Sequence, residues 1–141
     1  MTISSDYPPN IALIRKYLKP IKGTIFTYGQ TIHNPDEGDI DEPLMLHETT
    51  HAYQQGGRPE IWWDRYLLDK DFRFVQELEA YQIQYQRYCQ LNKDRNQRNK
   101  FLIRIASDLS SSLYGNLCTI PEAMTAIKSN LKFNVNSGDS K

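Results

Sequence analysis

The segment "LHETTHAYQQGG", residues 46–57, constrains the fold more than any other stretch of this 141-residue chain. It carries no proline, and the pair Gly56-Gly57 has the composition of a left-handed C-terminal cap. Upstream, Asp41 is suited to the N-cap of the same helix. We therefore predict a helix over residues 43–55 that is preceded by an acidic loop.

His47 and His51 would project from one face of this helix, because residues four apart lie one turn apart. Their ring nitrogens could then bind one metal ion at about 2.0 Å. Glu48 lies on the adjacent face, where its carboxylate could reach a water on that ion and act as a general base. The His-Glu-x-x-His spacing therefore predicts a zinc site for hydrolysis.

Two histidines on a solvated helix face are the alternative explanation of this spacing. The residues beside the motif are uncharged, as a helix buried next to a metal site requires. They are Leu44, Met45, Leu46, Thr49, Thr50, Ala52 and Tyr53. A solvated face would normally include charges at these positions, so the flanks favour the metal site.

A catalytic zinc ion needs a third protein ligand, and the segment "FVQELEAYQ" offers two carboxylates. Aromatic residues at helical spacing predict a long helix over about residues 72–92. Relative to Phe74 on its buried face, Glu77 lies about 60° away and Glu79 about 140° away. Glu77 is therefore the expected ligand, with a salt bridge at the core rim as its alternative role, and Glu79 is expected to point to solvent.

The two segments "LMLHETTHAYQQGG" and "FRFVQELEAYQIQ" together resemble the gluzincin branch of zinc metallopeptidases. In that family His-Glu-x-x-His is completed by a glutamate on a following helix, often within Glu-x-x-Ala. The resemblance covers about residues 24–90. It implies that His47, His51 and Glu77 are zinc ligands and that Glu48 is the catalytic base.

The segment "GTIFTYGQTIH" predicts a hairpin that turns at Gly29-Gln30, and the resemblance implies that a peptide substrate could extend along it. Several related families place an aspartate after Glu-x-x-Ala, where this chain has Tyr81. The partner of a zinc-bound histidine is therefore expected elsewhere, at Asp71 or Asp108. Without a large second domain, the chain resembles the smallest members and phage or prophage proteins.

Peptide hydrolysis also needs a donor for the developing oxyanion. Tyr114 and His33 are the candidates for this catalytic role, although no spacing demands either. Their alternative roles are a core aromatic and a strand-end histidine.

The remaining patterns predict further helices between Pro9 and Pro20, through "KFLIRIASDLSSSLYGN" up to Gly115, and over "TIPEAMTAIKSNL". In the last segment Thr119 and Glu122 have capping-box spacing. The fold class is therefore α+β and mainly α. A small hairpin packs against the motif helix and the long second helix, as in a minimal zincin-like domain.

Residues 1–132 are expected to form one such domain, and residues 133–141 a disordered tail. The secondary structure around Trp62 and Trp63 stays open. Because adjacent residues cannot both face one core, one tryptophan is expected at a cleft or partner surface. The aromatic residues of the long helix are expected in the core.

The overall charge gives no reason to expect nucleic acid, an anionic membrane or a strongly charged substrate, because 17 basic residues balance 17 acidic ones. We expect no nucleic-acid and no membrane partner. The first residues lack a secretory signal, and Cys89 and Cys118 lie far apart, so a cytoplasmic location is expected, with virion association if a phage encodes the chain.

Three possible functions from different classes follow. The first is a zinc metallopeptidase that acts on a peptide or protein substrate. The second is a structural or assembly protein, for example of a phage particle, that keeps the metallopeptidase fold with zinc as a structural staple and binds protein assembly partners. A metal-free helical binding module is the third.

Overall fold

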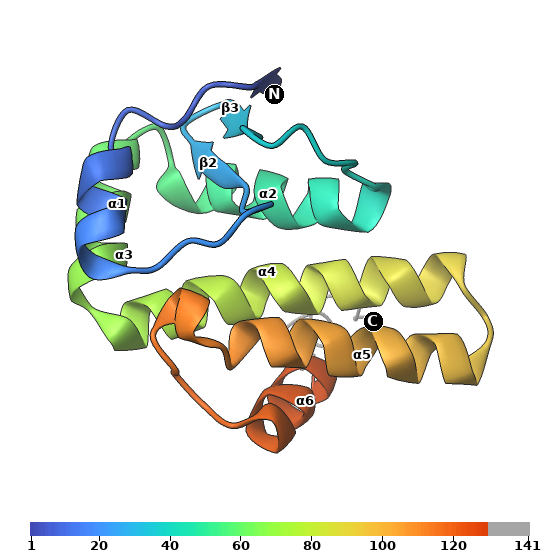
Figure 1. The fold of residues 1–141 in the computed structure, drawn as a ribbon. Coiled ribbons are helices and arrows are strands. Elements are labelled where there is room, and N and C mark those ends of the chain that lie inside the picture. The colour runs from blue at the N-terminus through green and yellow to red at the C-terminus, as the bar shows by residue number, and fades with distance from the viewer. Residues whose placement is uncertain (130–141) are drawn as a thin grey trace.

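The computed structural model describes residues 1–129, which form a mainly helical α+β fold with a small sheet at one edge (Figure 1). The fold class is thus confirmed. The strands β1 (Thr2–Ser4), β2 (Phe26–Tyr28) and β3 (Thr31–His33) lie in the order β1-β3-β2. β1 was not predicted and runs parallel to β3. The predicted tail over residues 133–141 lies outside the described residues.

The predicted hairpin is confirmed, because β2 and β3 pair antiparallel. Gly29 opens the turn with a φ of 63°, a left-handed conformation that glycine adopts without steric cost. β2 forms one edge of the sheet, next to the helix that carries the two histidines. The hairpin therefore stands beside the motif, as expected.

The motif helix, α2, spans Glu42–Gln55. The Asp41 side chain accepts a hydrogen bond from the backbone N–H of Leu44 at 2.9 Å, and Gly56 ends the helix with a φ of 56°. Both predicted ends are confirmed. The face of α2 that is buried is mostly polar and consists of Pro43, His47, Glu48, His51, Ala52 and Gln55. Burial of so many polar groups demands partners inside the protein.

The segment around the tryptophans forms helix α3 (Pro59–Leu68), which leads directly into α4 (Lys70–Leu91). The expectation of one exposed tryptophan is wrong, because Trp62 and Trp63 are only 5% and 6% exposed, although both line a pocket. Helix α3 is covered on two sides. Trp62 donates to Gln76 on α4, whereas Trp63 donates to the carbonyl of Thr27 on β2.

The helix α1 (Ile11–Tyr17) and the final helix α6 (Ile120–Ser129) are confirmed. In α6 the predicted capping box is present, because Thr119 and Glu122 exchange two backbone-to-side-chain hydrogen bonds.

The helix predicted up to Gly115 is wrong at its end, because α5 (Arg95–Leu109) stops earlier and the short 3₁₀ helix η1 (Ser112–Tyr114) follows. The hydroxyls of Ser110 and Ser111 donate to the carbonyls of Ser107 and Asp108. These local bonds compete with continuation of the helix.

The buried apolar residues form two clusters. One joins α4, α5 and α6, and it takes in the aromatic residues of α4, so their predicted core role is confirmed. The other joins α1, β2 and α3. Helix α2 packs lengthwise on α4 (Figure 1), and this contact positions the candidate site.

Candidate metal centre

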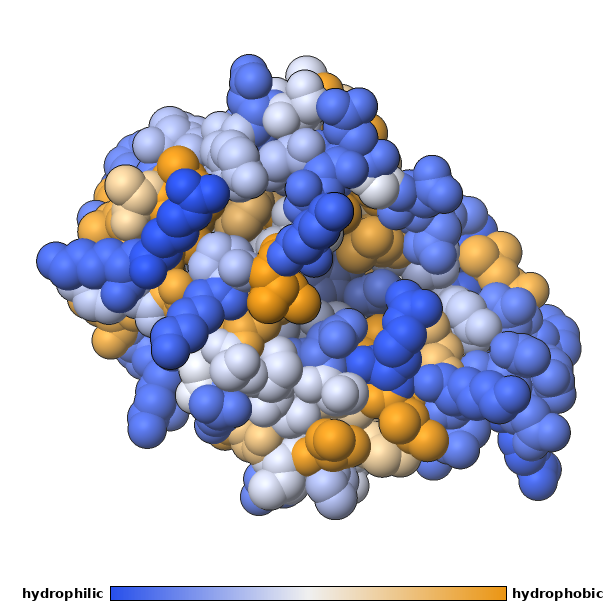
Figure 2. All heavy atoms as spheres, viewed as in Figure 1, coloured by the Kyte–Doolittle hydropathy of each residue, from blue (hydrophilic) through white to orange (hydrophobic). Residues whose placement is uncertain are grey.

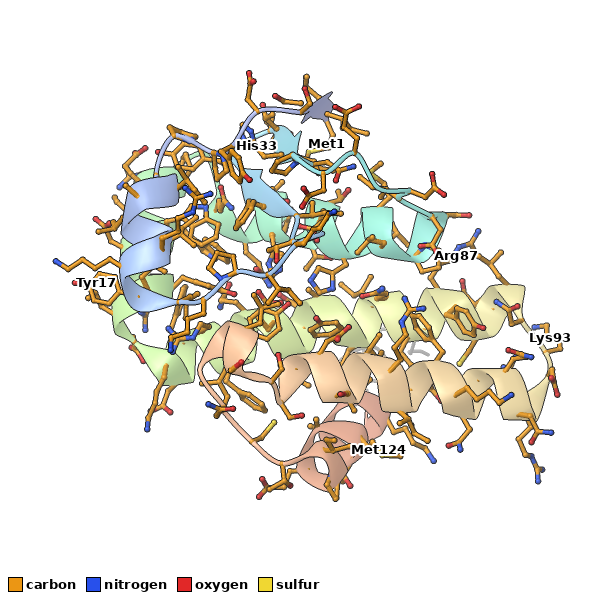
Figure 3. The ribbon with its side chains drawn as sticks, viewed as in Figure 1. Met1, Tyr17, His33, Arg87, Lys93 and Met124 are labelled. Atoms are coloured by element: carbon orange, nitrogen blue, oxygen red, sulfur yellow. The ribbon has the colours of Figure 1, made fainter. Side chains whose placement is uncertain are left out.

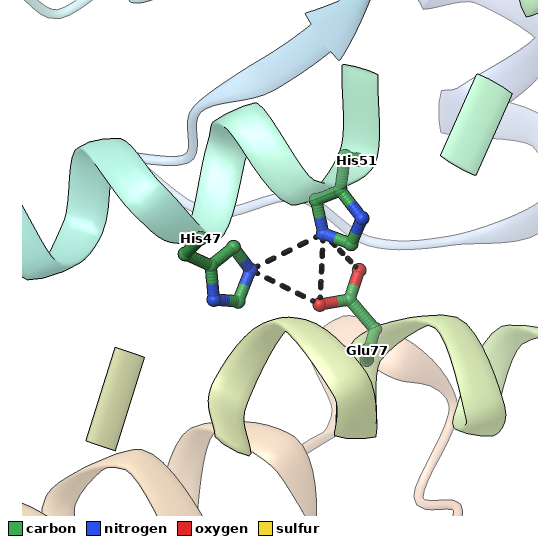
Figure 4. Close-up of side chains that lie close together, drawn as sticks. All are labelled: His47, His51 and Glu77. Atoms are coloured by element: carbon green, nitrogen blue, oxygen red, sulfur yellow. Dashed lines mark hydrogen bonds and ion pairs between the residues drawn. The ribbon is translucent and has the colours of Figure 1, made fainter. Parts of the chain in front are cut away.

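The packing of α2 on α4 brings His47, His51 and Glu77 together (Figure 4). The two Nε2 atoms lie 3.2 Å apart, and each lies 3.3 Å from a carboxylate oxygen of Glu77. All three residues are buried, at 3% to 5% exposure. This group could bind a metal ion, and it consists of the three residues predicted as ligands.

The spacing of these atoms fits a tetrahedral ion. Two ligand atoms at about 2.0–2.1 Å from such an ion lie roughly 3.3 Å apart. The observed separations are 3.2 and 3.3 Å. Three electron-pair donors that converge in a buried space also repel one another unless a cation or a proton lies between them. The residues present therefore fit zinc.

A chain of side chains fixes the ring of His51. The Gln54 amide group donates to the Gln76 carbonyl at 3.0 Å and to Glu79 at 2.9 Å, and both of these partners are acceptors. The Gln54 oxygen must then face His51 Nδ1, which lies 2.8 Å away and therefore carries a hydrogen. Nε2 of the neutral ring is left with its lone pair directed at the centre.

Gln84 acts in the same way on the other ring, because its oxygen lies 2.9 Å from His47 Nδ1. The expected partners Asp71 and Asp108 are wrong: Asp71 is exposed at the start of α4, and Asp108 makes no hydrogen bond to either ring. Spacing could have found Gln84, since it lies two helical turns beyond Glu77 and shares its face. No motif points to a glutamine in this role.

The expectation for Glu79 also needs correction. Its side chain is half-buried and accepts the Gln54 hydrogen bond, so it belongs to the support of His51 and does not simply point to solvent. The spacing of about 100° per residue along a helix distinguished the two carboxylates correctly. It could not predict that a neighbouring helix covers both of them.

Tyr66 holds the second oxygen of the central carboxylate. Its hydroxyl donates to Oε2 of Glu77 at 2.5 Å, from the last turns of α3. Both groups are buried, and burial together with Glu77 raises the pKa of Tyr66 well above 10.0. The phenol therefore stays a donor at any ordinary pH. Sequence patterns gave no sign of this contact.

The group titrates as a unit in the absence of metal. Burial lowers the pKa of His51, but the Glu77 carboxylate outweighs this effect and raises it from 6.5 to about 9. Burial favours the neutral form of Glu77, but the two histidines hold its pKa well below its usual range. Without a cation, the centre therefore holds a proton shared with Glu77 near neutral pH.

Glu48 is buried beside this group and does not belong to it. The hydroxyl of Thr27 on β2 donates to Glu48 Oε1 at 2.8 Å. Thr27 itself is fixed, because its carbonyl accepts hydrogen bonds from Gln55 and Trp63. A strand thus orients the carboxylate that the motif predicts to be the base.

Two pockets meet at Glu48. The first, here called the inner pocket, has a volume of about 50 Å³ and reaches His47, His51 and Glu77, the candidate metal-binding group, and both tryptophans. The second, the outer pocket, has a volume of about 350 Å³ and extends past Arg104 and Asp108. Figure 2 shows a hollow in the middle of the face viewed. His47 and Glu48 line both pockets, so a ligand could reach them from either side.

The two oxyanion candidates are placed differently. Tyr114 lines both pockets, and its hydroxyl lies 2.8 Å from that of Tyr81. His33 lies on the sheet, across α2 from α4 (Figure 3), and its ring nitrogen contacts the carbonyl of Asp6 at 3.0 Å. His33 lines neither pocket, so the structure brings Tyr114 to the centre and leaves His33 apart from it.

No protein-family model, curated protein or solved structure matches this chain. Among residues 1–129, none of the helices is long and apolar enough to cross a membrane. Cys89 and Cys118 are both free thiols.

Proposed function

We propose that this chain is a zinc-dependent metallopeptidase that hydrolyses peptide bonds in a peptide or protein substrate. The observation that carries the proposal is that a buried carboxylate outside the metal-binding group, Glu48, lines both pockets that adjoin His47. A general base has to reach both the water and the substrate, and Glu48 lies where it could reach both.

In this proposal His47, His51 and Glu77 hold the ion, with Gln54, Gln84 and Tyr66 as their supports. Bound zinc would polarise the peptide carbonyl and lower the pKa of a water molecule toward neutrality.

Glu48 accepts the water proton and passes it to the leaving amine, while Thr27 keeps its carboxylate directed at the cleft. Tyr114 is the proposed donor to the oxyanion because it lines both pockets, as Glu48 does.

A zinc-stabilised assembly protein, for example a virion component, is the second candidate. The observation in its favour is that the group ties α2 to α4 and is buried at all three residues, as a structural staple would be. The pockets favour the enzyme instead, because a staple needs no open space beside its ligands and no buried carboxylate without a ligand role.

Replacement of Glu48 by Gln separates the two candidates. The enzyme proposal predicts that Glu48→Gln binds zinc as the native chain does and loses peptide hydrolysis by about two orders of magnitude or more. Glu42→Gln, an exposed change on the same helix, is the matched control and should cleave normally. Equal hydrolysis by Glu48→Gln and the native chain would refute the mechanism.

A further inference from the structure

The residues that line the inner pocket determine which chemical group it can bind. Apolar side chains from four elements form its walls away from the metal-binding group: Ile14, Leu18, Phe26, Trp62, Trp63 and Leu113. Of the described residues, the only carboxylates that line it are Glu48 and Glu77, and no lysine or arginine does. An acidic substrate side chain would find no lysine or arginine as a counter-ion here, and it would lie close to these two carboxylates, so the pocket favours an apolar group over an anionic one.

Its size sets a second limit. The volume is about 50 Å³, and part of that space lies against the metal-binding group. A water molecule needs roughly 10–15 Å³, whereas an apolar cavity that takes up benzene measures about 150 Å³. An aromatic ring therefore does not fit. A side chain of one to three carbon atoms does.

The walls cannot readily widen. Ile14 is 2% exposed, and each tryptophan is tied by its ring N–H to a neighbouring element. Close-packed walls of this kind resist insertion of extra methylene groups.

We infer that the inner pocket is a specificity site that accepts one small aliphatic substrate side chain, alanine or valine, next to the scissile bond and rejects aromatic and acidic ones. The position of this side chain next to the scissile bond rests on the proposed function. The pocket's preference for a small apolar group does not depend on hydrolysis.

Both tryptophans of the chain line this pocket, so their fluorescence reports its occupancy. The probes are the peptides acetyl-Gly-Gly-X-Gly-amide with X as alanine, valine, phenylalanine or aspartate, so that only one side chain can fill the pocket. They are titrated into Glu48→Gln with one equivalent of zinc. The valine peptide should bind with a dissociation constant about tenfold or more below those of the phenylalanine and aspartate peptides.

Two enlarging variants test the walls in the same background. Ile14→Ala should improve binding of the phenylalanine peptide about fivefold or more relative to the valine peptide. Leu113→Ala, at a half-buried position with less effect on folding, should act in the same direction. Ile127→Ala, in the separate α4–α5–α6 cluster, is the matched control and should leave the preference unchanged.

The outcomes are distinguishable from those that test the proposed function. Binding of all four peptides with equal affinity, or of none, would overturn the inference. Cleavage by the native chain without preference for small residues would overturn it too and leave the peptidase intact. Selective binding without any cleavage would instead retain the specificity site and remove the peptidase.

Discussion

Tyr66 donates its hydroxyl hydrogen to Oε2 of Glu77 at 2.5 Å, with both side chains buried. This bond engages one carboxylate oxygen and leaves Oε1 at 3.3 Å from Nε2 of both His47 and His51. The phenol thereby orients the only anionic member of the group. Its contribution can be measured, because phenylalanine keeps the ring and removes the donor.

Tyr66→Phe should weaken zinc binding about 10- to 100-fold, the usual cost of losing a hydrogen bond to a metal ligand. Competition with a chromophoric chelator measures the affinity. Tyr88→Phe, on the α4–α5 side of the core, is the control and should bind zinc as the native chain does. Unchanged affinity in Tyr66→Phe would show that Glu77 is oriented by packing alone.

Gln54 and Gln84 should contribute to zinc affinity to a similar degree. Gln54→Leu and Gln84→Leu remove the oxygens that face the Nδ1 atoms of the two histidines. Each should lower zinc affinity about 10- to 100-fold, since a ring without its partner can rotate or take the wrong tautomer. Nuclear magnetic resonance of the imidazole nitrogens checks the tautomer directly. Retention of the Nδ1–H form in Gln54→Leu would contradict the assigned role of Gln54.

Thr27→Val should affect catalysis and not metal binding. Valine keeps the shape of threonine but cannot donate to Glu48, which lies 2.8 Å from the hydroxyl. We expect kcat to fall about tenfold while zinc content stays the same, because a general base contributes only when it is oriented. Thr31→Val on the neighbouring strand controls for the sheet. A loss of zinc in Thr27→Val would place Thr27 in the metal site instead.

Zinc binding should release protons. The pKa of His51 is raised to about 9 in the metal-free chain, so the ring is protonated near pH 7, whereas the ion needs a bare nitrogen. Calorimetry in buffers of different ionisation enthalpy should give about one proton released per zinc at pH 7. Apparent affinity should rise about tenfold per pH unit and level off near the pKa of about 9. If zinc binding released no proton, the protonation of His51 in the metal-free chain would be contradicted.

The same pair governs the stability of the metal-free chain. Because the folded pKa of His51 is raised from 6.5, its stabilising effect is complete below pH 6.5 and is lost as the pH rises toward about 9. Because the pKa of Glu77 is lowered from 4.5, its effect is complete above pH 4.5 and is lost on acidification. The unfolding temperature measured in the presence of a chelator should therefore be highest between pH 4.5 and pH 6.5.

The sequence predicted the elements whose signals are local. The ends of α2 depend on Asp41 and Gly56, and the choice of Glu77 over Glu79 depends on helical periodicity within one segment. The three members of the group that could bind a metal ion could therefore be named before the fold was known. The third strand could not, since Thr2–Ser4 gains its partners only by pairing with β3.

The long-range contacts that support the site could not be predicted from the sequence for the same physical reason, although helical periodicity does place Gln84 on the same face as Glu77. Thr27 and Glu48 are 21 positions apart, and Gln84 and His47 are 37 apart, so neither contact leaves a periodic trace. The burial of both tryptophans likewise depends on α3 lying between two neighbours.

The metal content of the purified protein tests most directly whether the chain has a metal centre. Elemental analysis of the native chain, purified without chelator and supplied with zinc, should find about one zinc per chain. His47→Ala should lose it, whereas His33→Ala, a histidine on the sheet, should keep it. Absence of metal from the native chain, or equal zinc in His47→Ala, would contradict the assignment of His47, His51 and Glu77 as a metal centre.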